Sequence, residues 1–170
     1  RRVLFRSISY RQSSCRRAFS TQIRMRIRHH VNPLKARFQQ PFKLPNDFLS
    51  QVFEDPGLPV HLDIGSGKGR FLLSRGASCD DMNFLGLEIR KPLVIRANDW
   101  RDSLGLRNVH FLYCNANVAL DEVVRVVGEH KMACVSIQFP DPHFRKRNWK
   151  RRIVQPPLVE SLGRGRSEER

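Results

Sequence analysis

Three closely spaced glycines between a strand-like and a helix-like segment constrain the fold of this chain more than any other feature. Gly65, Gly67 and Gly69 follow the apolar stretch 60–64, and the helix-like stretch 70–75 comes directly after them. Glycines at this spacing let the backbone turn tightly, approach a ligand closely and enter a helix. The pattern predicts the first strand, loop and helix of a βαβ unit.

An acidic residue at the end of the next strand-like run supports this prediction. Glu88 lies 21 residues after Gly67, where nucleotide-binding βαβ units carry the acid that accepts hydrogen bonds from a ribose. Two common loop types fit less well, because Arg70 breaks the dinucleotide fingerprint and Gly69 replaces the Ser/Thr of a phosphate P-loop. A G-x-G-x-G loop preceded by Asp63 resembles motif I of S-adenosylmethionine-dependent methyltransferases.

The rest of the chain after residue 59 alternates strand-like and helix-like segments. Strands are predicted at 60–64, 83–87, 109–113 and 132–139, and helices at 70–75, 92–104 and 120–127. Such alternation predicts an α/β fold with a parallel sheet, in which ligands bind beyond the carboxyl ends of the strands. Four groups lie at those ends: 63–69, Glu88, Asn115–Ala116 and 138–141. We therefore expect the functional site there.

A proline-bracketed acid followed by a basic segment forms the second notable motif. Asp141 stands between Pro140 and Pro142, and six of the nine residues 144–152 are Lys or Arg. The prolines hold Asp141 on a stiff, extended corner. A rigid acid beside basic and aromatic residues suits the binding of a nucleobase and its phosphates. A turn followed by a solvated charge run is the alternative.

Most of the net charge of +15 lies in the first part of the chain. Residues 1–46 hold 12 Lys/Arg and no acid. Residues 1–25, rich in Arg and Ser, have the composition of a transit peptide and predict a chloroplast or mitochondrial location. Cytoplasm or nucleus is the alternative, with the segment acting as an RNA-contacting arm or being untranslated sequence upstream of Met25. Residues 26–58 are interpreted as an N-terminal extension.

Membrane and metal functions are not predicted. The sequence has no run of 18 apolar residues. Its four cysteines show no C-x-x-C spacing, which favours neither zinc nor a disulfide framework. The adjacent His29 and His30 lack acid or cysteine partners nearby, so we interpret them as surface residues.

Several motifs together resemble the tRNA (guanine-N7)-methyltransferase family. They are Asp63–Gly69, Asn83–Arg90, Asn115–Asn117, Phe139–Phe144 and Lys150–Arg152, and the resemblance covers about residues 30–160. The segment His30–Leu34 is similar to a leader of plant and cyanobacterial-like members. The resemblance implies a Rossmann-like, S-adenosylmethionine-dependent methyltransferase fold, with a mostly parallel sheet and helices on both faces. It also implies methylation of N7 of a guanine in the tRNA variable loop.

The resemblance implies a role for individual residues as well. S-adenosylmethionine would contact Asp63, Gly65, Gly67, Glu88, Arg90, Asn115, Ala116 and Gln138. Asp141 matches the proposed catalytic aspartate, and tRNA would contact Arg145, Lys146, Arg147 and Arg152. We expect Glu88→Ala to weaken cofactor binding and Glu122→Ala, chosen as a control, to leave it unchanged.

After residue 160 the sequence departs from the family pattern. Residues 59–160 are therefore interpreted as an incomplete methyltransferase domain whose C-terminal strands are missing, and 161–170 as a disordered tail. An exposed fourth strand would make the chain marginally stable, with little activity. A non-catalytic RNA-binding or regulatory fragment, and a methyltransferase for another nucleobase, are the alternatives. A nicotinamide oxidoreductase is disfavoured by Arg70.

Overall fold

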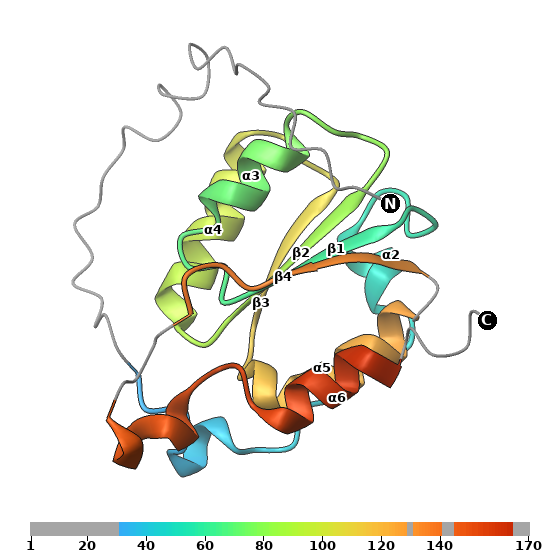
Figure 1. Ribbon diagram of the computed structural model, residues 1–170. Helices are drawn as coiled ribbons and strands as arrows, with labels where there is room; N and C mark the ends of the chain where they lie inside the picture. Colours follow the sequence, from blue (N-terminus) through green and yellow to red (C-terminus); the bar gives the residue numbers. More distant parts are fainter. Residues whose placement is uncertain (1–30, 129–130, 141–144, 165–170) are drawn as a thin grey trace, which may run out of the picture.

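The computed structural model describes residues 31–128, 131–140 and 145–164 of the chain. Within these ranges it is an α/β sandwich of one sheet between two helical layers (Figure 1). Its elements are η1 (Ala36–Phe38), α2 (Phe48–Val52), β1 (Val60–Ile64), α3 (Arg70–Gly76), β2 (Asn83–Glu88), α4 (Lys91–Ser103), β3 (Val109–Tyr113), α5 (Ala116–Val127), β4 (Met132–Ser136), η3 (Lys146–Arg151) and α6 (Pro156–Arg164).

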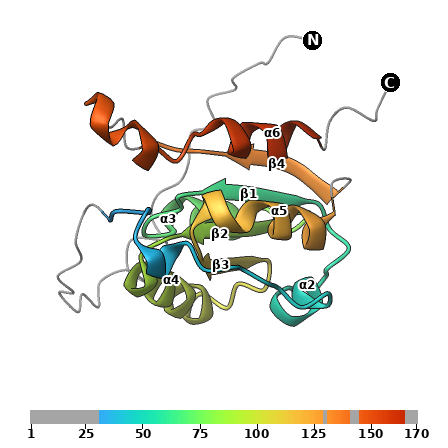
Figure 2. The ribbon, with the colours of Figure 1, turned by 90° about the horizontal axis from the view of Figure 1, so that it is seen from below.

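The four strands form a parallel sheet in the order β3-β2-β1-β4 (Figure 2). Strand β1 is central, and the register places Ile64 beside Leu87 of β2. The parallel α/β fold predicted from the sequence is confirmed. Because all strands point the same way, their carboxyl ends meet at one end of the sheet.

Side-chain alternation along the strands separates two apolar cores. Leu62 and Ile64 of β1 face the layer that contains α2, α5 and α6, where Leu120 and Leu158 are also buried. Phe84, Val109 and Phe111, together with Leu72 and Ala97, form the core under α3 and α4. Figure 1 shows α3 and α4 on one side of the sheet, with α5 and α6 on the other. The predicted helices on both faces are therefore present.

Three elements differ from the sequence prediction. Strand β4 ends at Ser136 and is half exposed rather than buried, since in the described residues only β1 pairs with it. Helix α5 begins at Ala116, four residues earlier than expected, because Asn115 caps it. Helix α6 continues to Arg164, so residues 161–164 are helical rather than tail, and α6 buries Leu158 in the core shared with α5. The predicted tail residues 165–170 and leader 1–25 lie outside the described residues.

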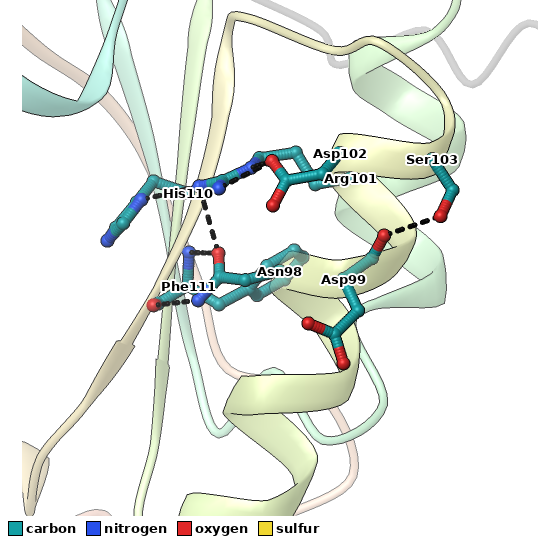
Figure 3. A network of polar contacts seen from close by, with 7 residues as sticks. All are labelled: Asn98, Asp99, Arg101, Asp102, Ser103, His110 and Phe111. Atoms are coloured by element: carbon teal, nitrogen blue, oxygen red, sulfur yellow. Dashed lines mark hydrogen bonds and ion pairs between the residues drawn. The ribbon is translucent and has the colours of Figure 1, made fainter. Parts of the chain in front are cut away.

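A side chain closes the outer edge of β3, the last strand of the sheet. The amide of Asn98 in α4 donates to the Phe111 carbonyl at 2.9 Å and accepts from the Phe111 N–H at 3.1 Å (Figure 3). Beside it, Arg101 donates to Asn98 Oδ1 and contacts His110 Nδ1 at 2.8 Å. Burial and the Arg101 charge lower the pKa of His110 to about 4. Asn98 thereby occupies hydrogen-bonding groups that an edge strand otherwise presents to other chains.

Among the described residues no helix is both long enough and apolar enough to cross a membrane.

Candidate functional site

A pocket opens at the carboxyl ends of the strands, where the sequence predicted the site. Its walls come from strand ends, from the start of α5, from the segment before η1 and from the end of η3. The lining residues are Val31, Pro33, Ile64, Gly65, Leu87, Glu88, Ile89, Arg90, Cys114, Asn115, Ala116, Asn117, Ile137, Gln138, Phe139, Pro140, Arg151 and Ile153.

The glycine loop borders the pocket through Gly65, and its backbone adopts conformations that favour glycine. Gly65, Gly67 and Gly69 have φ angles of +83°, +59° and +73°. A Cβ atom on Gly69 would lie 2.6 Å from the Phe111 ring, so this glycine also permits α3 to pack on the sheet. The N–H groups of Gly65 and Ser66 both donate to the Leu87 carbonyl, which fixes the loop to β2.

Glu88 is the most strongly hydrogen-bonded side chain in the pocket. Its carboxylate accepts from the Gly67 N–H at 2.9 Å, from the Arg90 N–H at 2.9 Å, and from Arg90 Nε and Nη2 at 2.9 and 3.0 Å. Glu88 is only 4% exposed. These bonds hold a buried negative charge at the end of β2, directly beside the glycine loop. A ligand hydroxyl that binds here would share the carboxylate oxygens with these donors or displace one of them.

Asp63 lies beneath the pocket and does not line it. Its Oδ1 accepts from Ser136 Oγ at 2.6 Å, and the same hydroxyl contacts His61 Nε2 at 2.9 Å. Burial raises the pKa of Asp63, while its hydrogen bonds to Ser136 and to Gln138 act in the opposite direction. Asp63 therefore joins β1 to β4 and orients Gln138, which does line the pocket.

Asn115 has a structural role in addition to its place in the pocket wall. Its Oδ1 accepts from the Asn117 N–H and so caps α5. Its Nδ2 donates to the Phe38 carbonyl at 3.1 Å and lies 3.5 Å from the Pro33 carbonyl. The start of α5 is therefore attached to the segment 31–38, from which Val31 and Pro33 reach the pocket.

The basic segment leads directly to the pocket. Arg145, Lys146 and Arg147 are exposed at the start of η3. Arg152 lies over the Trp149 ring, with its guanidinium carbon 5.1 Å from the ring centroid. None of these residues lines the pocket, but their neighbour Arg151 does. Positive charge therefore lies on the segment 145–152, which borders the pocket.

Most of the predicted cofactor residues converge on one cavity. Gly65, Glu88, Arg90, Asn115, Ala116 and Gln138 line the pocket, whereas Asp63 and Gly67 support it from behind. The predicted catalytic residue Asp141 lies outside the described residues. Sequence reasoning missed Val31, Pro33, Arg151 and Ile153 as wall residues, although 30–34 and 150–152 were among the motifs that carry the family resemblance.

Within the described parts of the chain, no group of three or more His, Cys, Asp or Glu side chains is placed to hold a metal ion. Cys114 lines the pocket, but burial raises the pKa of its thiol to about 12. A thiol with that pKa is protonated at neutral pH and is a poor nucleophile.

The chain is similar to known methyltransferases over most of its length. A family model described as "Putative methyltransferase" matches residues 58–165. A tRNA (guanine-N(7)-)-methyltransferase of Synechococcus sp. (strain JA-3-3Ab) is 56% identical over 137 residues, covering 81% of this chain and 56% of that protein. The protein of the same name from Thermosynechococcus vestitus is 49% identical, with coverage of 81% and 62%. The chain thus spans little more than half the length of these relatives.

Solved structures with a similar backbone include one titled "Structure of an antibiotic related Methyltransferase". It is 22% identical, covers 61% of this chain and 51% of that chain, and has a TM-score of 0.41.

Proposed function

We propose that the chain, which belongs to the family described as "Putative methyltransferase", transfers a methyl group from S-adenosylmethionine to N7 of a guanine in the variable loop of tRNA; the names of its relatives support this substrate. One observation carries the proposal: the pocket combines an anchored carboxylate, a glycine loop and a bordering basic segment at the carboxyl ends of parallel strands. The carboxylate and the glycine loop suit S-adenosylmethionine, and the basic segment suits tRNA.

The cofactor would occupy the pocket between the glycine loop and the start of α5. Glu88 would accept hydrogen bonds from the ribose hydroxyls, as acids at this position do in nucleotide-binding βαβ units. Gly65 leaves room for the backbone to approach the ligand closely. Gln138 and Ala116 line the same cavity and would contact other parts of S-adenosylmethionine.

The proposed reaction requires positioning rather than proton removal. Guanine N7 has a lone pair and no proton, so it attacks the methyl carbon as the carbon–sulfur bond breaks and S-adenosylhomocysteine leaves. Correct in-line placement of N7 and the methyl group supplies much of the rate enhancement in such a step. Asp141 is proposed to accept from guanine N1–H and N2–H and to favour the positive charge that develops on the ring.

The basic segment would place the tRNA. Arg145, Lys146, Arg147 and Arg152 are proposed to contact phosphates, which orients the nucleic acid without reading its sequence. Arg151 joins this set because it reaches the pocket itself.

A methyl-transfer assay tests the proposal. The protein is incubated with tRNA and S-adenosylmethionine, and the nucleosides are then analysed by mass spectrometry for N7-methylguanosine. We expect a small amount of product with the wild-type chain, because its exposed fourth strand predicts low activity, and none with Asp141→Asn, although Asp141→Asn should bind S-adenosylmethionine with unchanged affinity. Binding of tRNA without any methylated product would instead support a non-catalytic RNA-binding role, and methylation at another atom would support a different nucleobase.

The location of the protein is part of the proposal. Residues 1–25 are proposed to direct it to a chloroplast or mitochondrion, on the basis of their Arg- and Ser-rich, acid-free composition. A reporter fused after residue 25 should enter one of these organelles and lose the leader. Fluorescence in the cytoplasm or nucleus with the leader retained would contradict it.

A further inference from the structure

The segment 31–46, here called the strap, connects the pocket to an ion pair on α5 between the buried Glu122 and the exposed Arg125. At its start, Val31 and Pro33 line the pocket. From there it runs along α5 toward α2, as Figure 2 shows in blue to cyan. Phe38 is buried, and Phe42 and Leu44 pack against the core on the α5 side of the sheet. The strap is therefore a packed element and one wall of the cavity.

Helix α5 holds the strap at two places. Near the pocket, Asn115 donates to the Phe38 carbonyl at 3.1 Å. Two turns further along the helix, Glu122 Oε1 accepts from the Leu44 N–H at 2.9 Å. Arg125 binds the same region from the other side, donating to Asn46 Oδ1 at 2.9 Å and to the Leu44 carbonyl at 3.4 Å.

Glu122 and Arg125 also bind each other. Arg125 Nε and Nη2 donate to the two oxygens of Glu122 at 2.9 and 3.0 Å. These bonds, followed by the bond from Leu44, lower the pKa of Glu122 to about 2, so its carboxylate is ionised at neutral pH. Hydrogen bonds to a charged group are stronger than neutral ones. The pair thus fixes the backbone of the strap at Leu44.

We propose that Glu122 and Arg125 are positioning residues for the cofactor, acting through the strap, whose residues Val31 and Pro33 must be held in place to complete the pocket. The inference rests on the proposed function, because it takes S-adenosylmethionine to be the ligand of that pocket. It differs from the sequence prediction for Glu122→Ala, which was chosen as a control with no effect on binding. Glu122 is buried and bonded to the strap, so we now expect that variant to weaken binding as well.

Isothermal titration with S-adenosylmethionine tests the proposal on the full chain. Glu122→Gln should raise the Kd about three- to tenfold, in the range of couplings transmitted through packed contacts. Glu160→Gln removes the same charge from an exposed position on α6 and should leave the Kd unchanged. Asn46→Ala alters an exposed strap residue that binds Arg125, so the core stays intact. This variant should raise the Kd about twofold.

Hydrogen exchange separates this role from a general loss of stability. In Glu122→Gln, amides of the strap should exchange faster while those of β1 keep their protection, and added S-adenosylmethionine should slow the exchange of the strap. A uniform increase in exchange, or equal Kd values for wild type and Glu122→Gln, would overturn the strap proposal alone. A wild-type chain that does not bind S-adenosylmethionine would overturn the proposed function, and the inference with it.

Discussion

At the scale of single residues, Glu88 shows how the site is prepared for a ligand. A carboxylate offers about four lone-pair positions, and Gly67 and Arg90 already supply four hydrogen bonds to it. A ribose that binds Glu88 must therefore share these oxygens with the Arg90 guanidinium or displace it.

Glu88 and the glycines could be predicted because their spacing is local in the sequence. The Asp63–Ser136 hydrogen bond could not, since it joins two strands through residues 73 positions apart.

We expect Glu88→Ala to raise the Kd for S-adenosylmethionine at least about tenfold, because hydrogen bonds to a charged group are worth roughly 1.5–3 kcal/mol each. Isothermal titration measures the change. Glu160→Ala replaces an exposed glutamate on α6 and serves as the matched control. Equal affinity of Glu88→Ala and wild type would remove Glu88 from the cofactor site.

A second prediction at this scale concerns His110. The pKa is about 4 in the folded protein and 6.5 in an unperturbed histidine. Between these values the unfolded chain binds a proton that the folded chain does not, so the free energy of unfolding falls as the pH decreases. The expected loss is on the order of 3 kcal/mol between pH 6.5 and pH 4.

Urea unfolding of wild type and His110→Gln at a series of pH values tests this prediction. The difference between the two proteins isolates His110, because His61 and Asp63 titrate in both. The difference in the free energy of unfolding between wild type and His110→Gln should be constant above pH 7 and should change progressively below pH 6.5. A difference that is the same at pH 7.5 and pH 4.5 would mean that His110 is protonated equally in the folded and unfolded chains.

At the scale of elements, the sequence predicted those segments whose own residues carry a clear apolar pattern. The strands 60–64 and 109–113 have the predicted bounds. Helix α6 was not predicted, because its sequence contains two prolines and a glycine and it depends on burial of Leu158 beside α5. The strap was interpreted only as an extension, since its partners Asn115 and Glu122 are about 80 residues away in the sequence.

The basic segment that contains η3 gives a prediction for RNA binding. Replacing Arg145, Lys146 and Arg147 with Gln should weaken tRNA binding and reduce the slope of log K against log salt by about one for each phosphate that is no longer neutralised. Fluorescence anisotropy at several salt concentrations measures the slope. Replacing Arg75 and Arg107, which are exposed at the other end of the sheet, should change it little. A triple variant with the wild-type slope would show that the segment is a solvated surface.

At the scale of the whole molecule, the sheet is covered unevenly. Strands β1 and β2 are buried along their full length, whereas Ala133 and Cys134 of β4 are exposed. Exposed strand edges pair readily with other chains. The expectation of marginal stability from the sequence stays a prediction, but the exposure that motivates it is present in the described residues.

We expect the 170-residue chain to associate in a concentration-dependent manner through β4. Ala133→Lys places a charge on that strand and should shift the population toward monomer, because lysine disfavours edge pairing. Sedimentation velocity over a range of concentrations measures the effect. Ile95→Lys is the control: it adds the same charge at an exposed position of α4, away from the edge, and should not change the association. A wild-type chain that is monomeric at every concentration would contradict the prediction.

The two edges of the sheet differ in a way that limits how copies of this chain can join. The Asn98 side chain occupies the outward backbone groups of Phe111 on β3, whereas nothing in the described residues does the same for β4. Two copies that meet β4 to β4 use the same surface on both partners, and the combined sheet then ends in a blocked β3 on each side. Such an isologous contact is closed by a twofold axis. We therefore expect association through β4 to give a dimer, and Asn98→Ala, which frees the outward backbone groups of Phe111, to allow further edge-to-edge growth through β3.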